Sequence, residues 1–213
     1  MSYSIKEAFY SLQGEGIHSG RPAIFCRFTG CNLWSGREID RAKAACNFCD
    51  TDFIGTDGQN GGRFATPEAL AKHLLEFWPS SSVQPYLVLT GGEPLLQVDE
   101  PLISALRQAG FFLALETNGT LEVPEGIDWI CVSPKGRNAL QQQKGNELKL
   151  VYPQADVDPA SFLEMDFDHF ILQPLDGSAI HSEQMFTAQA LEYCLNHPEW
   201  RLGLQVHKYL RID

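Results

Sequence analysis

The sequence contains no apolar run approaching the roughly 20 residues needed to cross a bilayer, and its N-terminus lacks the pattern of a signal peptide. Basic residues are scarce, because 16 Lys and Arg face 27 Asp and Glu, for a net charge of -11. Phosphate binding requires clustered Lys and Arg side chains, so this deficit argues against an extended nucleic-acid surface. These absences favour a cytoplasmic protein with a small-molecule partner, bound to neither nucleic acid nor membrane.

Internal repeats and linkers are absent too, and the length fits one domain covering residues 1–213. A hydrophobic fraction of 44% with 20% charged residues is ordinary for a globular chain. Apolar and β-branched runs alternate with helical patterns. Strands are expected at residues 22–28, 86–90, 111–117, 128–133, 147–152, 169–173 and 200–206. Helices are expected after Thr66, near residues 100–108 and from about 183 to 196.

Strands that read as continuous apolar runs are typical of parallel sheets covered on both faces, which indicates an α/β fold. The strands are too few for an eight-stranded barrel, so we expect a partial, open (β/α) barrel of about six parallel strands. An open doubly wound sheet is the alternative. In both folds, polar residues just past the carboxyl ends of the strands line the ligand crevice. The unusual residues of this sequence stand at such positions: Cys31, 90–94, 116–119, 133–135 and 173–176.

Six cysteines in a reducing compartment indicate metal, redox or buried positions rather than disulfides. Cys46 and Cys49 form a C-x-x-C pair, which suits structural zinc, a redox dithiol or an iron-sulfur cluster. A closed zinc site needs a second ligand pair that the sequence lacks, and a redox dithiol needs no third cysteine. Cys31 supplies a third thiolate, and three thiolates leave one iron of a four-iron cluster open to a small molecule. Buried structural roles are expected for Cys26, Cys131 and Cys194.

This cysteine set resembles that of radical S-adenosylmethionine (SAM) enzymes, whose open iron binds the amino and carboxylate groups of SAM. Their usual spacing is C-x-x-x-C-x-x-C, with an aromatic residue in the last spacer, a position that Phe48 fits. The first spacer departs from this pattern, because residues 32–45 stand where three residues are usual and 35–45 form a charged insertion. The turn at 91–94, GGEP, resembles the superfamily motif that receives the methionine amino group. The resemblance implies SAM contacts at Phe48, Gly91, Gly92, Glu93, Ser133, Pro134, Lys135, Gln173, Pro174, Leu175 and Asp176.

The segment 9–16, FYSLQGEG, narrows the resemblance to the 7-carboxy-7-deazaguanine synthase (QueE) family, of which a subset carries a long first spacer. The same family is matched at residues 28–34, 49–51, 89–94, 116–119 and 133–135. This resemblance implies a lyase of queuosine and 7-deazapurine biosynthesis that converts 6-carboxy-5,6,7,8-tetrahydropterin to 7-carboxy-7-deazaguanine with loss of ammonia. A 5'-deoxyadenosyl radical would take the substrate C6 hydrogen and SAM would be regenerated, with no catalytic side chain beyond the cluster and SAM.

The family further implies a 4Fe-4S cluster on Cys31, Cys46 and Cys49, SAM, Mg2+ at Thr51, a flavodoxin- or ferredoxin-type electron donor and a homodimer. A pterin presents a donor-acceptor edge and a carboxylate, which call for amide, carboxylate and guanidinium partners. Arg27 lies in an apolar strand, where pairing with the substrate carboxylate is favoured over an outward, solvated position. Substrate contacts are expected at Leu12, Gln13, Gly14, Glu15, Arg27, Thr90, Glu116 and Asp213.

Two other functions stay open at this point. A radical SAM activase that installs a glycyl radical on a partner protein is also small, but such enzymes usually have the short spacer and lack the SLQGEG segment. A non-enzymatic zinc-binding protein would rest on the C-x-x-C pair alone.

Overall fold

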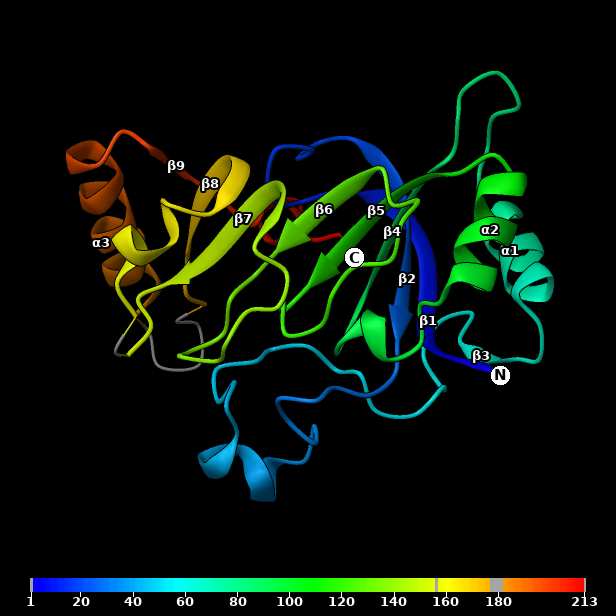
Figure 1. Ribbon diagram of the computed structural model, residues 1–213, viewed down its shortest axis with the longest axis horizontal. Coiled ribbons are helices and arrows are strands. Elements are labelled where there is room, and N and C mark those ends of the chain that lie inside the picture. The colour runs from blue at the N-terminus through cyan, green and yellow to red at the C-terminus, as the bar shows by residue number, and fades with distance from the viewer. Residues whose placement is uncertain (1, 156, 177–181, 213) are drawn as a thin grey trace.

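The computed structural model describes residues 2–155, 157–176 and 182–212, and one sheet runs through them (Figure 1). Its nine strands have the order β3-β1-β2-β4-β5-β6-β7-β8-β9. Their bounds are β1 (Tyr3–Leu12), β2 (Pro22–Phe28), β3 (Gly62–Phe64), β4 (Tyr86–Gly91), β5 (Phe112–Thr117), β6 (Trp129–Val132), β7 (Lys144–Tyr152), β8 (Asp166–Pro174) and β9 (Trp200–Leu202).

In the order of the sheet, the seven neighbouring strands β2, β4, β5, β6, β7, β8 and β9 are parallel. Strand β1 pairs antiparallel with both β2 and β3. With β3 at one edge and β9 at the other, the sheet stays open. The expected α/β fold with an open, mostly parallel sheet is therefore confirmed. The sequence patterns do not predict β1 or β3, and the end of β1 overlaps the segment 9–16, which the sequence marks only as a ligand-binding segment.

The expected strand at 200–206 is wrong beyond Leu202. The chain leaves the sheet at Gly203, whose amide donates to the Leu172 carbonyl at 2.8 Å. A side chain at Gly203 would lie 2.6 Å from Ile171 Cγ2, so the backbone turns where it presses against β8. A short helix, α4 (Val206–Leu210), follows and carries its side chains toward the carboxyl ends of the strands.

Longer helices cover the two ends of the sheet (Figure 1). Helix α1 (Pro67–Leu75) begins as expected, because Thr66 Oγ1 accepts a hydrogen bond from the Ala69 amide at 3.2 Å. Helices α1 and α2 (Glu100–Gln108) pack together, with α1 beside β1 and β3 and α2 beside β5, and α3 (Glu183–Asn196) lies beside β8 and β9. Short 3-10 helices form η1 (Glu38–Lys43), η2 (Pro94–Leu96) and η3 (Pro159–Phe162).

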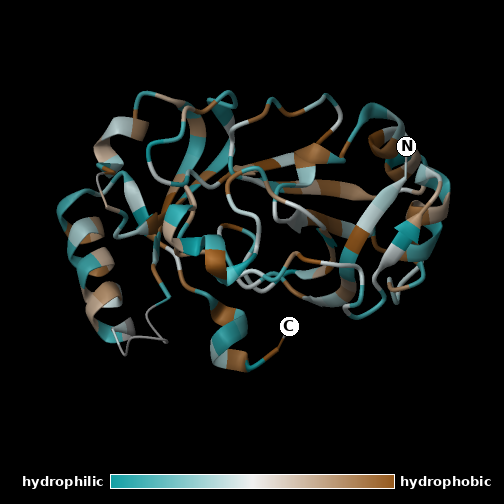
Figure 2. Ribbon diagram, turned by 90° about the horizontal axis from the view of Figure 1, so that it is seen from below, coloured by the Kyte–Doolittle hydropathy of each residue, from teal (hydrophilic) through white to brown (hydrophobic). Residues whose placement is uncertain are grey.

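The hydrophobic core is divided into two main clusters under these helices. One joins α1 and α2 to β1, β2, β4 and β5, with Leu70, Leu102 and Leu89 fully buried. The other joins α3 to the strands from β6 to β9 around Leu172. Figure 2 shows hydrophobic residues concentrated along the central strands. Within the described residues, no helix has the length and apolar character needed to span a bilayer.

Candidate active site

A cavity of about 420 Å³ lies at the carboxyl ends of the parallel strands, a size within the range of ligand pockets. Most residues nominated from the sequence line it: Leu12, Gln13, Gly14, Glu15, Arg27, Cys31, Cys46, Phe48, Cys49, Thr51, Thr90, Gly91, Gly92, Glu116, Ser133, Lys135, Gln173, Pro174, Leu175 and Asp176. Glu93 and Pro134 are outside this lining, and Asp213 lies outside the described residues. The polar residues expected at the strand ends thus lie around one cavity.

The long spacer between Cys31 and Cys46 is closed by a backbone hydrogen bond. The Ala45 amide donates to the Leu33 carbonyl at 3.1 Å, so residues 34–44 loop out from a pinched base. Across that base, Asn32, Leu33 and Ala45 are the residues that separate the two cysteines. Counted across this hydrogen bond, three residues separate Cys31 from Cys46, as in the first spacer of the usual cluster motif.

The three thiols lie together on one wall of the cavity. A hydrogen bond from Cys46 lowers the pKa of Cys49 to about 6, whereas burial raises the pKa of Cys31 despite hydrogen bonds from backbone amides. Among residues 2–155, 157–176 and 182–212, no three His, Cys, Asp or Glu side chains surround one metal-ion position. Three thiols on one wall suit an iron-sulfur cluster that is bound at three corners and open at the fourth.

The other cysteines stand apart from this wall. Cys26 is fully buried in the core and Cys131 is 4% exposed. Cys194, on α3, packs against the hydrophobic core around Leu172. All six cysteines are free thiols. The distinction between three ligating and three structural cysteines, which the sequence predicted, matches their placement.

Residues nominated for SAM gather next to Cys46 and Cys49. Lys135 Nζ donates to Ser133 Oγ at 2.8 Å and lies 5.8 Å from the centre of the Phe48 ring. At the end of β4, a side chain at Gly92 would lie 2.2 Å from the carbonyl oxygen of Gly30. Glycine at this position therefore lets the β4 turn press against the backbone that leads into Cys31.

Glu93 is fully buried and its carboxylate is occupied by protein donors. One oxygen accepts hydrogen bonds from the Leu95 amide at 3.0 Å and Thr117 Oγ1 at 2.9 Å, and the other accepts from the Asn118 amide at 2.8 Å. Burial raises the pKa of Glu93 even with these donors present. The placement favours a role in joining the β4 and β5 turns over the predicted direct contact with SAM.

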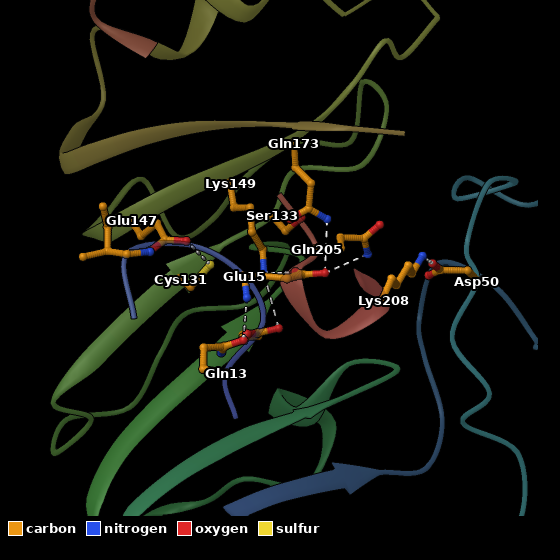
Figure 3. Close-up of polar contacts among 12 residues, drawn as sticks. Gln13, Glu15, Asp50, Cys131, Ser133, Glu147, Lys149, Gln173, Gln205 and Lys208 are labelled. Carbon is orange, nitrogen blue, oxygen red and sulfur yellow. Dashed lines mark hydrogen bonds and ion pairs between the residues drawn. The ribbon is translucent and has the colours of Figure 1, made fainter. Parts of the chain in front are cut away.

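Glu15 is the centre of a polar network on the opposite part of the cavity (Figure 3). Its Oε2 pairs with Lys149 Nζ at 2.5 Å, and its Oε1 accepts from Gln205 at 2.8 Å and Gln173 at 3.2 Å. Its backbone amide donates to Gln13 Oε1 at 3.1 Å. Burial alone would raise the pKa of Glu15, but the ammonium of Lys149 holds it well below its usual range.

Lys149 is the most informative residue that the sequence reasoning missed. It lies inside β7 with its side chain 5% exposed, and its Nζ is also 3.5 Å from Glu116 Oε2. Gln13 Nε2 donates to the other oxygen of Glu116 at 3.0 Å. The signal was present, because a lysine inside the apolar run ELKLVY is as unusual as the arginine in PAIFCRF.

Arg27 is held on the wall by its neighbour on β1. Its Nε donates to Glu7 Oε1 at 2.7 Å, in register with the pairing of β1 and β2. Both side chains are partly buried and both line the cavity. The ion pair fixes the plane of the guanidinium at the position from which it was expected to meet a carboxylate.

Helix α4 contributes further residues that strand patterns did not reveal. Lys208 Nζ pairs with Asp50 at 3.2 Å and with Asp176, which joins the loop after Cys49 to the end of β8. His207 packs so closely that a side chain at Gly14 would lie 2.1 Å from its Nδ1. These contacts place α4 along one side of the cavity.

Comparison with known proteins gives a consistent result over the full length of the chain, although no protein-family model matches it. The chain is 58% identical over 212 residues to the 7-carboxy-7-deazaguanine synthase of Bordetella pertussis, with all of both chains covered. The synthase of Burkholderia multivorans is 55% identical over 212 residues, again with full coverage. The chain belongs to the 7-carboxy-7-deazaguanine synthase family. The predicted lyase and its reaction in 7-deazapurine biosynthesis are thereby confirmed.

The crystal structure of QueE from Escherichia coli has the same fold, with a TM-score of 0.71 at 28% sequence identity. The match covers 97% of this chain and 95% of the other. Membership of the QueE family also confirms the predicted cofactors, a 4Fe-4S cluster, SAM and Mg2+. The residues assigned to each cofactor remain predictions. The thiols, hydroxyls and ammonium group that line the cavity are of the types that these cofactors need.

Proposed function

We propose that the cavity binds 6-carboxy-5,6,7,8-tetrahydropterin beside SAM and converts it to 7-carboxy-7-deazaguanine with loss of ammonia. The observation that supports this most directly is that two distinct sets of side chains share one cavity. Three thiols stand beside Phe48, Ser133 and Lys135, and a network of amides and carboxylates stands around Glu15. The first set suits a cluster with SAM, and the second suits the donor-acceptor edge of a pterin.

Cys31, Cys46 and Cys49 would hold the cluster, and Thr51 would offer its hydroxyl to Mg2+. A hydroxyl is a weak ligand for Mg2+, so carboxylate oxygens of the substrate would complete the coordination. When bound, the cluster and SAM supply the 5'-deoxyadenosyl radical that removes the C6 hydrogen of the substrate and later returns it.

The protein side chains would bind and orient the reactants. Lys135 and Ser133 would meet the carboxylate and ribose of SAM, and residues 173–176 would frame its adenosine. Arg27, already fixed by Glu7, would pair with the substrate carboxylate. Gln13 and Glu116 would bind the pterin edge, since they lie on the wall within one hydrogen-bonded network.

The decisive experiment uses substrate carrying deuterium at C6. Anaerobic enzyme reconstituted with iron and sulfide is mixed with SAM, Mg2+, a reductant and the labelled pterin. We expect 7-carboxy-7-deazaguanine as product, deuterium in the recovered SAM and no net loss of SAM. Uncoupled SAM cleavage without this product would contradict the proposed substrate, and unlabelled SAM after turnover would contradict the proposed hydrogen abstraction.

We also infer a single catalytic domain, a cytoplasmic location, a homodimer and a flavodoxin- or ferredoxin-type electron donor. Support for the last two comes from the family resemblance. Sedimentation of the purified enzyme would test the dimer. Turnover driven by reduced flavodoxin or ferredoxin in place of a chemical reductant would test the donor.

A further inference from the structure

The insertion in the cluster loop is a small folded unit built around Trp34. Trp34 is 7% exposed and packs edge-on against Phe53, with ring centres 5.6 Å apart. The 3-10 turn η1 follows, and the pinch between Leu33 and Ala45 closes the unit. The insertion is therefore attached to the fold and presents its residues at fixed positions beside the cysteines.

Arg41, in η1, is the residue of the insertion that reaches the cluster cysteines. One guanidinium nitrogen, Nη1, donates to the carbonyl oxygens of Asn47 at 3.0 Å and of Cys49 at 2.8 Å. The guanidinium carbon lies 4.1 Å from the centre of the Trp34 ring, and Glu38 pairs with the opposite side at 2.5 Å. The side chain is thus oriented on three sides, and two of its hydrogen bonds end on the C-x-x-C turn.

We propose that Arg41 is a positioning residue for the Cys46–Cys49 turn and that its fixed charge raises the reduction potential of the cluster held there. Reduction adds one negative charge to the cluster, so a nearby cation stabilises the reduced form. The same hydrogen bonds hold the turn in one conformation, with both thiols on the cavity wall. The inference rests on the proposed assignment of Cys31, Cys46 and Cys49 as the cluster ligands.

The sequence offers a matched control in the same insertion. Arg37 carries the same charge but pairs with Asp40 at 2.6 Å and is 68% exposed, against 31% for Arg41. Substituting glutamine at either position removes one positive charge from the insertion. Only at position 41 does the substitution also remove the two contacts to the C-x-x-C turn.

The test is a redox titration of the reconstituted enzyme, followed by electron paramagnetic resonance without SAM, for wild type, Arg41→Gln, Arg41→Lys and Arg37→Gln. For Arg41→Gln we expect about a tenfold shift of the equilibrium toward the oxidised cluster, a potential lower by about 59 mV for one electron. Arg41→Lys keeps the charge and should shift it less than threefold. Arg37→Gln should match wild type, and equal potentials for Arg41→Gln and Arg37→Gln would overturn the electrostatic part.

Positioning is read from the iron-free protein by hydrogen exchange at residues 46–50. Faster exchange is expected in Arg41→Gln and Arg41→Lys than in Arg37→Gln, because a lysine ammonium cannot pair with both oxygens of Glu38 and also reach the two carbonyl oxygens of the turn. Equal exchange in all variants would overturn the positioning role. If Arg41→Gln takes up no iron while Arg37→Gln does, positioning is supported, and the potential is measured in Glu38→Gln instead. This substitution leaves the Arg41 charge without its carboxylate partner and should raise the potential, and an unchanged potential would overturn the electrostatic part.

The iron content of the Cys46→Ala variant shows whether a failure lies in the role of Arg41 or in the proposed cluster ligands. Loss of the cluster in Cys46→Ala, with an unchanged potential in Arg41→Gln, would overturn the electrostatic role of Arg41 and leave the ligand assignment intact. A cluster retained in Cys46→Ala would overturn both.

Discussion

Glu15 and Lys149 form a buried ion pair of 2.5 Å between segments 134 residues apart, the end of β1 and the middle of β7. Lys149 also lies 3.5 Å from Glu116, so one ammonium sits between two carboxylates on the cavity wall. A buried ion pair stabilises a protein little more than apolar side chains in its place would, but it fixes the orientation of the two charged side chains. Its value here is that it holds two proposed pterin contacts in place.

Lys149→Met should therefore be strongly destabilising. It leaves the partly buried carboxylates of Glu15 and Glu116 without a cation, and we expect a loss of about 3–5 kcal/mol in the free energy of unfolding, measured with denaturant. Arg107→Met is a suitable control, since its pair with Asp128 is exposed and should contribute no more than about 1 kcal/mol.

A double mutant separates the ion pair from general packing. If the cost of Lys149→Met comes from stranded carboxylate charge, adding Glu15→Gln should recover part of it, because one uncompensated charge disappears. Strictly additive losses in the double mutant would show that the two side chains do not act as a pair.

The pH dependence of stability should report the same pair. The pKa of Glu15 falls from 4.5 to about 2 on folding, since Lys149 outweighs the burial that would raise it. Between these values the unfolded chain binds a proton that the folded protein does not, so stability falls as pH falls. The contribution is complete above pH 4.5 and disappears toward pH 2.

The measurement is the difference in unfolding free energy between wild type and Glu15→Gln at pH 6 and pH 3. That difference should shrink at pH 3, because other carboxyl groups titrate equally in both proteins. A difference that stays constant or grows on acidification would contradict the assigned direction of the shift.

Much of the site followed from one physical rule, that polar residues after parallel strands meet at a common edge. That rule placed Thr90, Glu116 and Ser133 on the cavity wall together. The rule does not predict Lys149, because this residue lies within a strand. It does not predict Gln205 either, because β9 ends earlier than its apolar pattern suggests. Lys149 is marked in the sequence only by its charge within an apolar run, whereas Gln205 depends on where β9 ends, which packing decides.

The cluster loop illustrates a second limit. The fourteen residues between Cys31 and Cys46 look like a departure from the short motif. A backbone hydrogen bond from the Ala45 amide to the Leu33 carbonyl brings the two ends of this segment together. Backbone hydrogen bonds within an irregular loop leave no periodic trace in the sequence, so the restored spacing could not have been predicted from it.

The division of the cysteines can be tested by iron content. Alanine at Cys31, Cys46 or Cys49 should abolish the cluster, seen as loss of iron and of its visible absorbance after anaerobic reconstitution. Cys26→Ala, Cys131→Ala and Cys194→Ala should keep full iron content, since these side chains lie away from the thiol wall. The buried positions should instead lose about 1–3 kcal/mol of stability through the cavities created.

Glu93 offers the sharpest test between contact with SAM and positioning. Glu93→Gln places an amide group among donors from Leu95, Thr117 and Asn118, so at least one buried donor loses its acceptor. We expect a loss of about 1–3 kcal/mol in unfolding free energy, measured without SAM. Glu100→Gln, at an exposed site on α2, should have no such effect.

Thr117→Val then distinguishes the two roles, because it removes the hydroxyl donor to Glu93 while the Glu93 carboxylate itself remains. If Glu93 positions the β4 turn, both variants should weaken SAM binding in proportion to their loss of stability. If Glu93 instead binds SAM directly, Glu93→Gln should weaken SAM binding far more than its stability loss predicts, and Thr117→Val should not. SAM affinity measured by calorimetry on the reconstituted enzyme, set against the unfolding data, decides between these outcomes.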